Sequence, residues 1–380
     1  MSNPLGSKYF KNLDSLRFFA FFGVFLCHCV AVPNIIPQNS FAGRTLQTFC
    51  YNGARGVQMF FVISGFIITY LLISEKIATG GISLKNFYFR RTLRIWPLFY
   101  LIIIYVFLIK PLLSQHFGIH WKFEFSDGYM NANPNPWVWS FFLGNFDIIV
   151  NGPPIQSELH LLWSLCVEEQ FYILWPVILK FIKVRKIPYA LCIGVLISIT
   201  LRIFFMRRYQ MLESNFNTFI LFDFFAIGGL LAYLITKKEK EIRDFMNKHV
   251  RSIYELLFIG IVFFLIGFDT YSNNGVFETS FKYTFYAVVF TLFILCFEFK
   301  DNSMTWIKGN VVFKYLGKVS YGLYMYHMVV WAILFSEFKN LTSIWLIVLA
   351  SLFSTILVSI GSFKFFETPF LNIARKYRKV

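Results

Sequence analysis

The sequence has little charge, and acidic residues are scarcer than basic ones. Only 15% of its 380 residues are charged, whereas 57% are hydrophobic and 21% are aromatic. A soluble domain of this size needs many more polar residues to cover its surface, so the composition excludes one. Successive apolar runs of about 17–23 residues, separated by short polar loops, instead indicate an all-α, polytopic integral membrane protein.

Cysteine is also scarce, and long linkers, repeats and low-complexity tracts are lacking. Of the six cysteines, all except Cys50 lie within apolar runs, which argues against a disulfide framework or a zinc site, and no metal is expected. The first apolar run is too long for a cleavable signal peptide, and further runs follow it. We therefore expect residues 1–380 to form a single membrane domain, with spans from about 13 to 364 and a short basic tail at 365–380.

The apolar runs predict about ten transmembrane helices around a central cavity. Their approximate bounds are 13–32, 54–74, 97–114, 160–180, 188–206, 219–236, 253–269, 281–299, 315–336 and 344–364. The apolar stretch 137–150 is too short to be a further span, and we interpret it as a re-entrant or interfacial helix beside the loop NANPNP.

The formal net charge of +16 first suggests a nucleic-acid partner, but its distribution does not. Most Lys and Arg residues fall in the loops on the side of the N-terminus, which is the positive-inside pattern of a cytoplasmic surface. The charge therefore predicts membrane lipids as partners, no nucleic acid, and both termini in the cytoplasm.

His28 lies inside the first apolar run, Leu13 to Val32, where an ionisable side chain is expensive and usually faces a bundle interior or a watery cavity. Arg17 precedes it by 11 residues, which on a helix is a rise of about 16 Å and a net rotation of about 20°. The spacing predicts a cavity that leads from Arg17 at one membrane surface to a buried base, His28. The alternative is a histidine that is hydrogen-bonded to a neighbouring backbone carbonyl.

A second polar constellation is the segment HLLWSLCVEEQFYILWP, which contains Glu168 and Glu169. Glu168 lies about 12 Å along a helix from the outer surface, so it can meet His28 in the outer half of the membrane. A carboxylate beside an imidazole orients the ring, fixes its tautomer and raises its basicity. The alternative is a structural pair between Glu168 and Arg202, and the two interpretations are not exclusive.

The segment FYFRRTLRIWP places Arg90, Arg91 and Arg94 immediately before a span. Guanidinium groups bind phosphate bidentately, so three of them at a membrane mouth suit phosphate recognition. Such basic stretches also serve topology and contact with lipid headgroups.

The segment LGKVSYGLYMYHMVVW places Tyr324 and His327 three residues apart, on one face of a helix. Both side chains can line a cavity or donate to a developing oxyanion. The small residues Gly53, Gly56, Ser64 and Gly65 of the second span favour close helix packing.

Taken together, these segments resemble the membrane-bound acyltransferase-3 family, the O-acetylating and O-acylating enzymes of bacterial surface glycans. The resemblance runs from Leu13 to Phe370 through LDSLRFFAFFGVFLCH, GVQMFFVISGFII, RRTLRIWPLFY, HLLWSLCVEEQFYILWP and LGKVSYGLYMYH, and ends on FETP. It implies a bacterial cytoplasmic (inner) membrane protein that takes acetyl-CoA or another acyl-CoA from the cytoplasm. His28 then matches the essential histidine of the first helix and Arg17 its basic partner, while Arg90, Arg91 and Arg94 match the arginines that handle the donor.

The sequence departs from the family pattern at three places. Gln58 stands where many members have an acidic residue. Cys166 stands where a small residue is usual, and its thiol raises the alternative of a covalent acyl-cysteine intermediate. No extracytoplasmic hydrolase-like domain follows the last span, so glycan-assembly proteins are possible partners.

The resemblance implies an O-acyltransferase that moves an acyl group from acyl-CoA to a hydroxyl of a glycan or lipid-linked saccharide. In this hypothesis Arg17, Arg90, Arg91 and Arg94 bind the donor, His28 is the general base oriented by Glu168, and Tyr324 or His327 stabilises the oxyanion. A transporter or flippase for a lipid-linked sugar is the alternative, because it also needs ionisable groups in a membrane cavity. The sequence identifies neither the acceptor nor the acyl chain.

Overall fold

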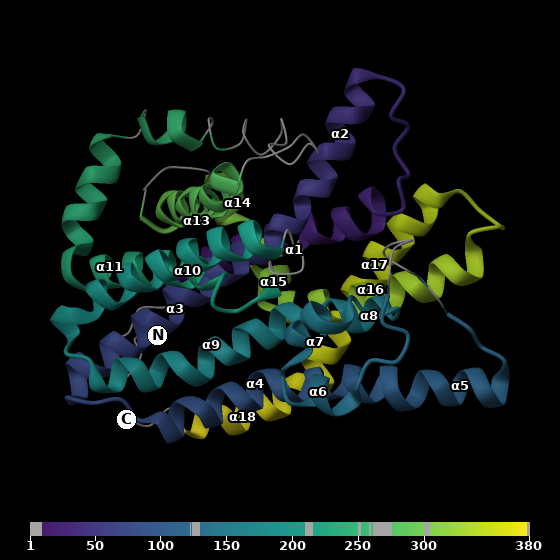
Figure 1. Cartoon of the computed structure of the whole chain (residues 1–380), viewed down its shortest axis with the longest axis horizontal. Helices are drawn as coiled ribbons and strands as arrows, with labels where there is room; N and C mark the ends of the chain where they lie inside the picture. The colour runs from purple at the N-terminus through teal and green to yellow at the C-terminus, as the bar shows by residue number, and fades with distance from the viewer. Residues whose placement is uncertain are drawn as a thin grey trace.

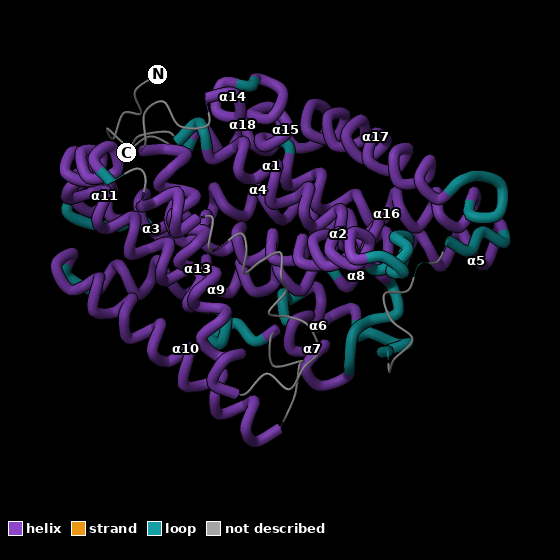
Figure 2. The backbone as a smooth tube through the Cα atoms, turned by 90° about the horizontal axis from the view of Figure 1, so that it is seen from above, coloured by secondary structure: helices purple, strands orange, loops and turns teal. Residues whose placement is uncertain are grey.

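The computed structural model consists of helices joined by loops, and Figure 2 shows no strand in the part of the chain that the structure describes. The described residues are 10–121, 123, 130–209, 216–249, 252–257, 260, 276–299 and 305–377. The all-α class expected from the sequence is confirmed.

The helices of the first half of the chain are α1 (Leu13–Leu26), η1 (Cys27–Ala31), α2 (Phe41–Asn52), η2 (Gly53–Arg55), α3 (Gly56–Thr79), α4 (Leu84–Ile104), η3 (Tyr105–Ile109), α5 (Lys110–Phe117), α6 (Pro136–Ser140), α7 (Gly144–Asn151), α8 (Ser157–His160) and α9 (Leu162–Phe181). Those of the second half are η4 (Val184–Lys186), α10 (Ile187–Tyr209), α11 (Phe222–Lys248), α13 (Val276–Phe299), α14 (Thr305–Gly309), α15 (Val311–Lys318), α16 (Ser320–Phe338), α17 (Ile344–Ser362), η6 (Phe363–Glu367) and α18 (Thr368–Lys376).

The protein is a multi-pass membrane protein. By length and composition, the described helical segments that can cross a membrane are Leu13–Ala31, Phe41–Thr79, Leu84–Phe117, Ser157–Phe181, Val184–Arg207, Phe281–Phe299 and Ile344–Lys376. The helices α15 and α16 meet at a bend of 74° and add one more if the pair is a single broken span. Each of these segments corresponds to a span expected from the sequence.

Two of the expected spans have a different outcome. The stretch 219–236 falls in α11, which is not among the segments long and apolar enough to cross, because charged residues follow closely in KKEKEIRD. The helix also kinks at Lys238, where this charged half begins. The stretch 253–269 lies largely outside the described residues.

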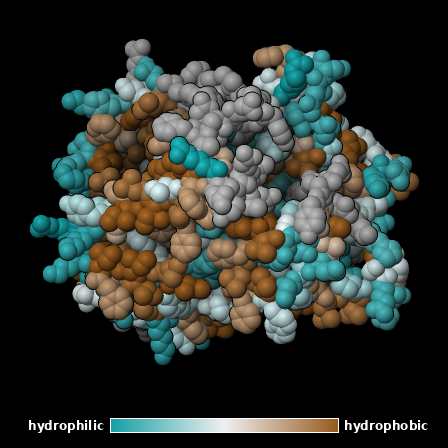
Figure 3. All heavy atoms as spheres, viewed as in Figure 1, coloured by the Kyte–Doolittle hydropathy of each residue, from teal (hydrophilic) through white to brown (hydrophobic). Residues whose placement is uncertain are grey.

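The surface has the polarity that a bilayer requires. Figure 1 shows α3, α4, α9 and α10 running roughly along the horizontal axis of the view. In the same view, Figure 3 shows apolar side chains across the middle and hydrophilic ones gathered at the left and right ends. The helices therefore present an apolar belt to lipid and polar ends to water.

Glycines allow the central helices to approach closely. A Cβ at Gly65 of α3 would collide with the backbone oxygen of Phe225 in α11, and one at Gly228 with that of Val62. Gly56 is held in the same way against the carbonyl of Ala20 in α1. The packing role predicted for the small residues of this segment therefore holds for Gly65 and Gly56. Small residues at membrane helix interfaces allow the backbones to approach closely.

The helix ends follow local sequence. Ser40 caps α2 by accepting a hydrogen bond from the Gly43 backbone N–H, and Asn310 caps α15 in the same way. Gly80 and Gly118 end α3 and α5 in the left-handed region, at φ of 80° and 66°, where glycine has no steric cost.

The first span does not remain a regular α-helix to its end. It widens at η1 into a π-helical turn, and His28 is the second residue of that turn. A π-turn inserts an extra residue and changes the direction in which the following side chains point, and such turns are frequent at functional sites.

The stretch 137–150 forms two short helices, α6 and α7, instead of the one helix expected. The chain breaks between them at Phe142, which has a φ of 58°. The indole N–H of Trp139 donates to Asp147 over 2.8 Å and ties the two helices together. Neither helix is long enough to cross a membrane.

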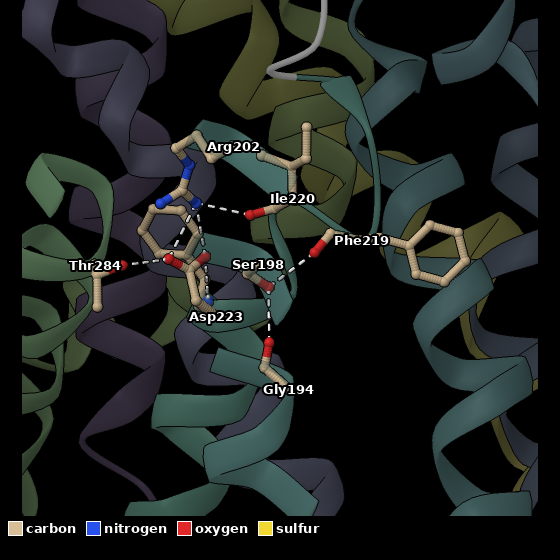
Figure 4. Close-up of polar contacts among 8 residues, drawn as sticks. Gly194, Ser198, Arg202, Phe219, Ile220, Asp223 and Thr284 are labelled. Atoms are coloured by element: carbon tan, nitrogen blue, oxygen red, sulfur yellow. Dashed lines mark hydrogen bonds and ion pairs between the residues drawn. The ribbon is translucent and has the colours of Figure 1, made fainter. Parts of the chain in front are cut away.

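A buried ion pair joins α10, α11 and α13 (Figure 4). The Nη2 of Arg202 lies 3.0 Å from Asp223 Oδ2 and donates to the Ile220 carbonyl over 2.7 Å. The Thr284 hydroxyl donates to the same carboxylate, and the Tyr283 ring lies 4.9 Å from the guanidinium carbon. The sequence-based alternative that pairs Arg202 with Glu168 is therefore wrong, since Asp223 is the nearer acid.

Candidate active site

A cavity lies among α1, α3, α4, α9, α15 and α16. It holds about 830 Å³ of space, part of it open to solvent. Its walls are formed by Arg17, Val57, Phe60, Phe61, Ser64, Ile67, Ile68, Arg91, Arg94, Ile95, Ser164, Leu165, Glu168, Tyr172, Lys318, Ser320, Tyr321 and Tyr324. The lining combines an apolar wall with a few polar groups, as the linings of small-molecule sites do.

The cations of this cavity lie toward its mouth. Arg94 and Lys318 are exposed and Arg91 is half-buried. Neither Arg91 nor Arg94 has an acidic or hydrogen-bonding partner among the described residues, although Arg91 stacks over the Tyr172 ring at 5.1 Å. Arg17 differs, because its guanidinium lies 3.0 Å from Asp14. Neither guanidinium makes an ion pair of its own, and Glu168 and Asp14 act on them only through longer-range attraction, so the two together form a site for a phosphate-bearing ligand.

Arg90 does not belong to this group. Its guanidinium donates to the backbone carbonyl of Tyr377 over 3.1 Å, and it is not part of the cavity lining. Figure 1 shows α18, which precedes Tyr377, beside the start of α4. The arginine motif is therefore split. Arg91 lies about 100° around the helix from Arg90, on the side of the cavity, whereas Arg90 is held outside by its bond to Tyr377 although it is only about 40° from Arg94. The expectation that Arg90 shares the donor site is corrected on this geometry.

Glu168 takes part in a compact polar triangle on the cavity wall. Its carboxylate accepts from the Ser64 hydroxyl over 2.9 Å and from the Tyr172 hydroxyl over 3.1 Å. The two hydroxyl oxygens are themselves 3.0 Å apart. Arg91 lies over the Tyr172 ring, so the triangle and the unpaired guanidinium share one wall.

The inner part of the cavity ends at a second hydroxyl pair. Ser164 Oγ and Tyr324 Oη are 2.8 Å apart, and both lie within hydrogen-bonding distance of the Leu161 carbonyl. Tyr324 also connects the cavity to the histidines, because its backbone carbonyl is 2.7 Å from Nδ1 of His327.

His28 and His327 form a hydrogen-bonded pair with nearly parallel rings. Nδ1 of His28 lies 3.0 Å from Nε2 of His327, and the rings are 5° from parallel. A carbonyl oxygen can only accept, so Nδ1 of His327 carries a proton toward Tyr324. In the neutral ring Nε2 of His327 then accepts from Nδ1 of His28, which leaves the lone pair of neutral His28 on Nε2. This chain of two bonds fixes the tautomer that a general base needs.

This arrangement corrects two expectations about roles. Glu168 was expected to orient His28, but its carboxylate is bonded to Ser64 and Tyr172, and His327 is the residue that touches the ring. His327 was also expected to donate to an oxyanion, but both of its ring nitrogens are already engaged. His327 is a positioning residue, because it acts through His28.

The histidine pair adjoins the cavity and does not form part of its lining. His327 is fully buried, whereas His28 is partly exposed. The link between the arginine mouth and His28 therefore runs through Tyr324 and His327. Among the described residues, no group of three or more His, Cys, Asp and Glu side chains could hold a metal ion.

The sequence analysis did not identify Ser164, Tyr172 and Lys318 as site residues. A signal existed for Tyr172, because it follows Glu168 by four residues and the two share a helix face. Lys318 reaches the mouth because the chain bends between α15 and α16. Hydropathy does not reveal such a bend.

These features define a helical, multi-pass membrane protein with a cation-lined cavity that leads toward a histidine pair. Residues 10–363 match the family of the acyltransferase domain, acyltransferase 3, and the chain belongs to this family. The resemblance seen in the sequence motifs is thereby confirmed.

Curated relatives come from Staphylococcus aureus. The O-acetyltransferase OatA of strain NCTC 8325 is 28% identical over 384 residues, which cover 95% of this chain and 57% of that protein. A protein of strain COL with a provisional O-acetyltransferase name is 28% identical over 382 residues, which cover 96% of this chain and 57% of that protein. The chain thus spans little more than half the length of these relatives. No solved structure matches it.

Proposed function

We propose that this chain is a membrane O-acyltransferase that moves an acyl group, in particular acetyl, from acyl-CoA to a hydroxyl of a glycan or lipid-linked saccharide. The observation that carries the proposal is the pair of guanidinium groups, Arg91 and Arg94, that line the cavity without an ion pair of their own. At its inner part the cavity contacts the histidine pair, in which hydrogen bonds fix the tautomer of each ring. The family supports acyl transfer, and the names of the relatives support an O-acetyl product.

The donor occupies the arginine cavity in this proposal. Arg91 and Arg94, with Lys318 at the rim, bind the phosphates of acyl-CoA, and the thin pantetheine arm extends between Ser64 and Tyr321 toward Ser164. Arg17 lines the same cavity, so it contributes positive potential although Asp14 is bonded to it. Binding energy from the remote nucleotide thereby positions the thioester for reaction.

The chemical step needs one base and one leaving group. Nε2 of His28 removes the proton from the acceptor hydroxyl, and the oxygen attacks the thioester carbonyl carbon. A carbon–oxygen bond forms, the carbon–sulfur bond breaks, and CoA leaves as the thiolate. The imidazolium returns its proton to that sulfur, so the products are an O-acyl ester and CoA thiol. Tyr324, at the inner part of the cavity, is the proposed donor to the oxyanion.

Direct transfer is favoured over an acyl-cysteine intermediate. Cys166 is fully buried, whereas His28 is partly exposed. A covalent route needs a nucleophile that the thioester can reach.

Location and partners complete the proposal. The arginine side faces the cytoplasm, where the donor is, and the protein lies in a bacterial cytoplasmic membrane with both termini inside. This orientation follows the bias of Lys and Arg toward the loops on that side. Glycan-assembly proteins are proposed partners on the opposite side.

The test uses the full chain in liposomes with acetyl-CoA labelled in the acetyl group. We expect label in an alkali-labile ester, with CoA thiol released in equal amount. His28→Gln should lower kcat about 10²–10⁴-fold, the range for loss of a general base. His116→Gln, on the exposed surface of α5, is the matched control and should leave kcat unchanged. Wild-type turnover in His28→Gln would remove the base, and sugar translocation without label transfer would favour a carrier.

A further inference from the structure

A second cavity lies at the opposite end of the helix that carries the arginines. It holds about 630 Å³, part of it open to solvent, and its lining includes Lys110, Ser114, Trp121, Phe123 and Gln156. Lys110 follows Arg94 by 16 residues, so the two cavities are about 24 Å apart along the α4–η3–α5 helix. They therefore open toward opposite sides of the membrane.

One buried polar atom without a partner belongs to Gln156, which lines this second cavity, and three more belong to residues within two positions of a lining residue. Gln156 Oε1, Ser157 Oγ, Glu158 Oε2 and the Tyr105 hydroxyl are buried and make no hydrogen bond to any described residue. Gln156 lines the cavity, and Ser157 and Glu158 follow it directly. Buried polar groups are nearly always satisfied, so a group of four calls for a partner that the protein itself does not supply. Of these oxygens, Gln156 Oε1 belongs to the lining, and it suits a ligand that offers a hydroxyl donor.

The charge of the cavity argues for a neutral ligand. Among the described lining residues Lys110 is the one Lys or Arg, and its Nζ is 2.7 Å from Glu158 Oε1. Glu158 is fully buried, so the pair is internally compensated. A phosphate or carboxylate ligand would meet no uncompensated cation here, in contrast to the arginine cavity.

Aromatic rings supply the apolar part of the lining. The indole N–H of Trp121 donates to Glu337 over 2.7 Å, which holds this ring at the cavity. The ring of Phe123 is buried beside it. A fixed aromatic ring next to unsatisfied oxygens suits a molecule that has both C–H faces and hydroxyl groups, which is the chemistry of a sugar.

The second cavity also comes close to the histidine pair. Phe123 contacts the Trp331 ring, with centroids 5.6 Å apart, and Trp331 lies one helical turn after His327 on α16. The indole nitrogen of Trp331 is buried and has no partner among the described residues. The ring of Trp331 thus lies between Phe123, which lines the second cavity, and the imidazole pair.

We infer that this second cavity binds the acceptor, and that the acceptor is an uncharged saccharide. Gln156 accepts a hydrogen bond from one of its hydroxyls, and Trp121 contacts an apolar sugar face. The role of this ligand as the acceptor rests on the proposed acyl transfer. The binding site itself rests on the unpartnered oxygens and on the compensated charge.

The test measures sugar binding directly, with the full chain in lipid nanodiscs. The probes are the methyl β-glycosides of glucose and N-acetylglucosamine, with the methyl glycoside of glucuronate and glucose 6-phosphate as charged counterparts. Saturation-transfer NMR should detect the uncharged glycosides and not the charged ones. Gln156→Ala and Trp121→Ala should each weaken binding about ten-fold, the effect of losing one good polar or stacking contact. Gln115→Ala removes the same side chain from the exposed surface of α5 and should change nothing.

Three results would overturn the inference: no signal from the uncharged glycosides, stronger binding of the charged ones, or equal binding in wild type and Gln156→Ala. Labelled acetyl transfer separates this failure from that of the proposed function. Acetyl transfer with an unchanged acceptor KM in Gln156→Ala would disprove the saccharide site and would still support the acyltransferase activity. Glycoside binding that the variants weaken, in a protein without acetyl transfer, would keep a saccharide site and reject the enzyme.

Discussion

Two groups of arginines within membrane-spanning segments differ in how their charge is balanced. Arg202 is buried against Asp223, a backbone carbonyl and an aromatic ring, all within the protein. Arg91 and Arg94 face a cavity and have no acidic or hydrogen-bonding partner among the described residues. An ionisable residue in a membrane segment is therefore not by itself a sign of function. The sign is a charge that the fold positions but leaves uncompensated.

The largest effect should come from removing the compensated arginine. Arg202→Ala leaves Asp223 buried without its cation, which costs about 3–5 kcal/mol of stability. Thermal unfolding in detergent should occur at a markedly lower temperature, and membrane abundance should fall. The double variant Arg202→Met/Asp223→Leu removes both charges and should recover much of the loss. If Arg202→Ala unfolds at the wild-type temperature, the contrast between the two groups is broken.

Removing an uncompensated arginine should affect the ligand and not the fold. Arg91→Ala and Arg94→Ala should each raise the KM for acetyl-CoA about 10–100-fold, which corresponds to about 1.4–2.7 kcal/mol. The unfolding temperature should stay near that of wild type, because neither side chain makes an ion pair within the protein that its removal would break. A drop as large as that of Arg202→Ala would place these arginines in the structural group.

Substitution of Glu168 should change donor binding by a smaller amount and in the opposite direction. Its carboxylate lines the same cavity as Arg91 and Arg94, so it opposes the phosphates of the donor. Glu168→Gln should tighten CoA binding a few-fold, on the order of 1 kcal/mol or less. Calorimetric titration of CoA checks the sign. Weaker binding in Glu168→Gln would instead show that the carboxylate holds Arg91 in place through Tyr172.

The smallest effect is expected at Arg90, which serves as the matched control for its neighbours. It belongs to the same RRTLR motif, but its guanidinium is bonded to the Tyr377 carbonyl outside the cavity. Arg90→Ala should change the KM for acetyl-CoA less than two-fold. A change as large as that of Arg94→Ala would return Arg90 to the donor site.

Hydropathy and motif order predicted much of this molecule. The apolar runs gave the all-α class and most of the spans, because each run only has to satisfy its own backbone in lipid. The motifs also placed Arg17, Arg91, Arg94, Glu168 and Tyr324 in residues that line one cavity. Helical spacing was sufficient for Arg91 and Arg94, since both lie on the single helix α4.

Contacts between helices could not be predicted in the same way. The pairing of His28 with His327 joins residues 299 positions apart, and a π-turn sets the direction of His28. The positions of Glu168 and His28 along their helices put both at a similar depth in the membrane, so Glu168 was expected to contact His28. Depth does not fix the rotation of one helix against another. The exclusion of Arg90 had the same origin, because it depends on how α18 returns to the start of α4.

The most direct test of the account is the binding of CoA to the full chain, measured by calorimetry in wild type and in Arg91→Ala/Arg94→Ala, with Arg90→Ala as the control. We predict that wild type and Arg90→Ala bind CoA alike, that binding weakens as salt screens the phosphates, and that the double variant binds at least 100-fold more weakly. Equal affinity in the double variant and in wild type would contradict the assignment of this cavity to the donor.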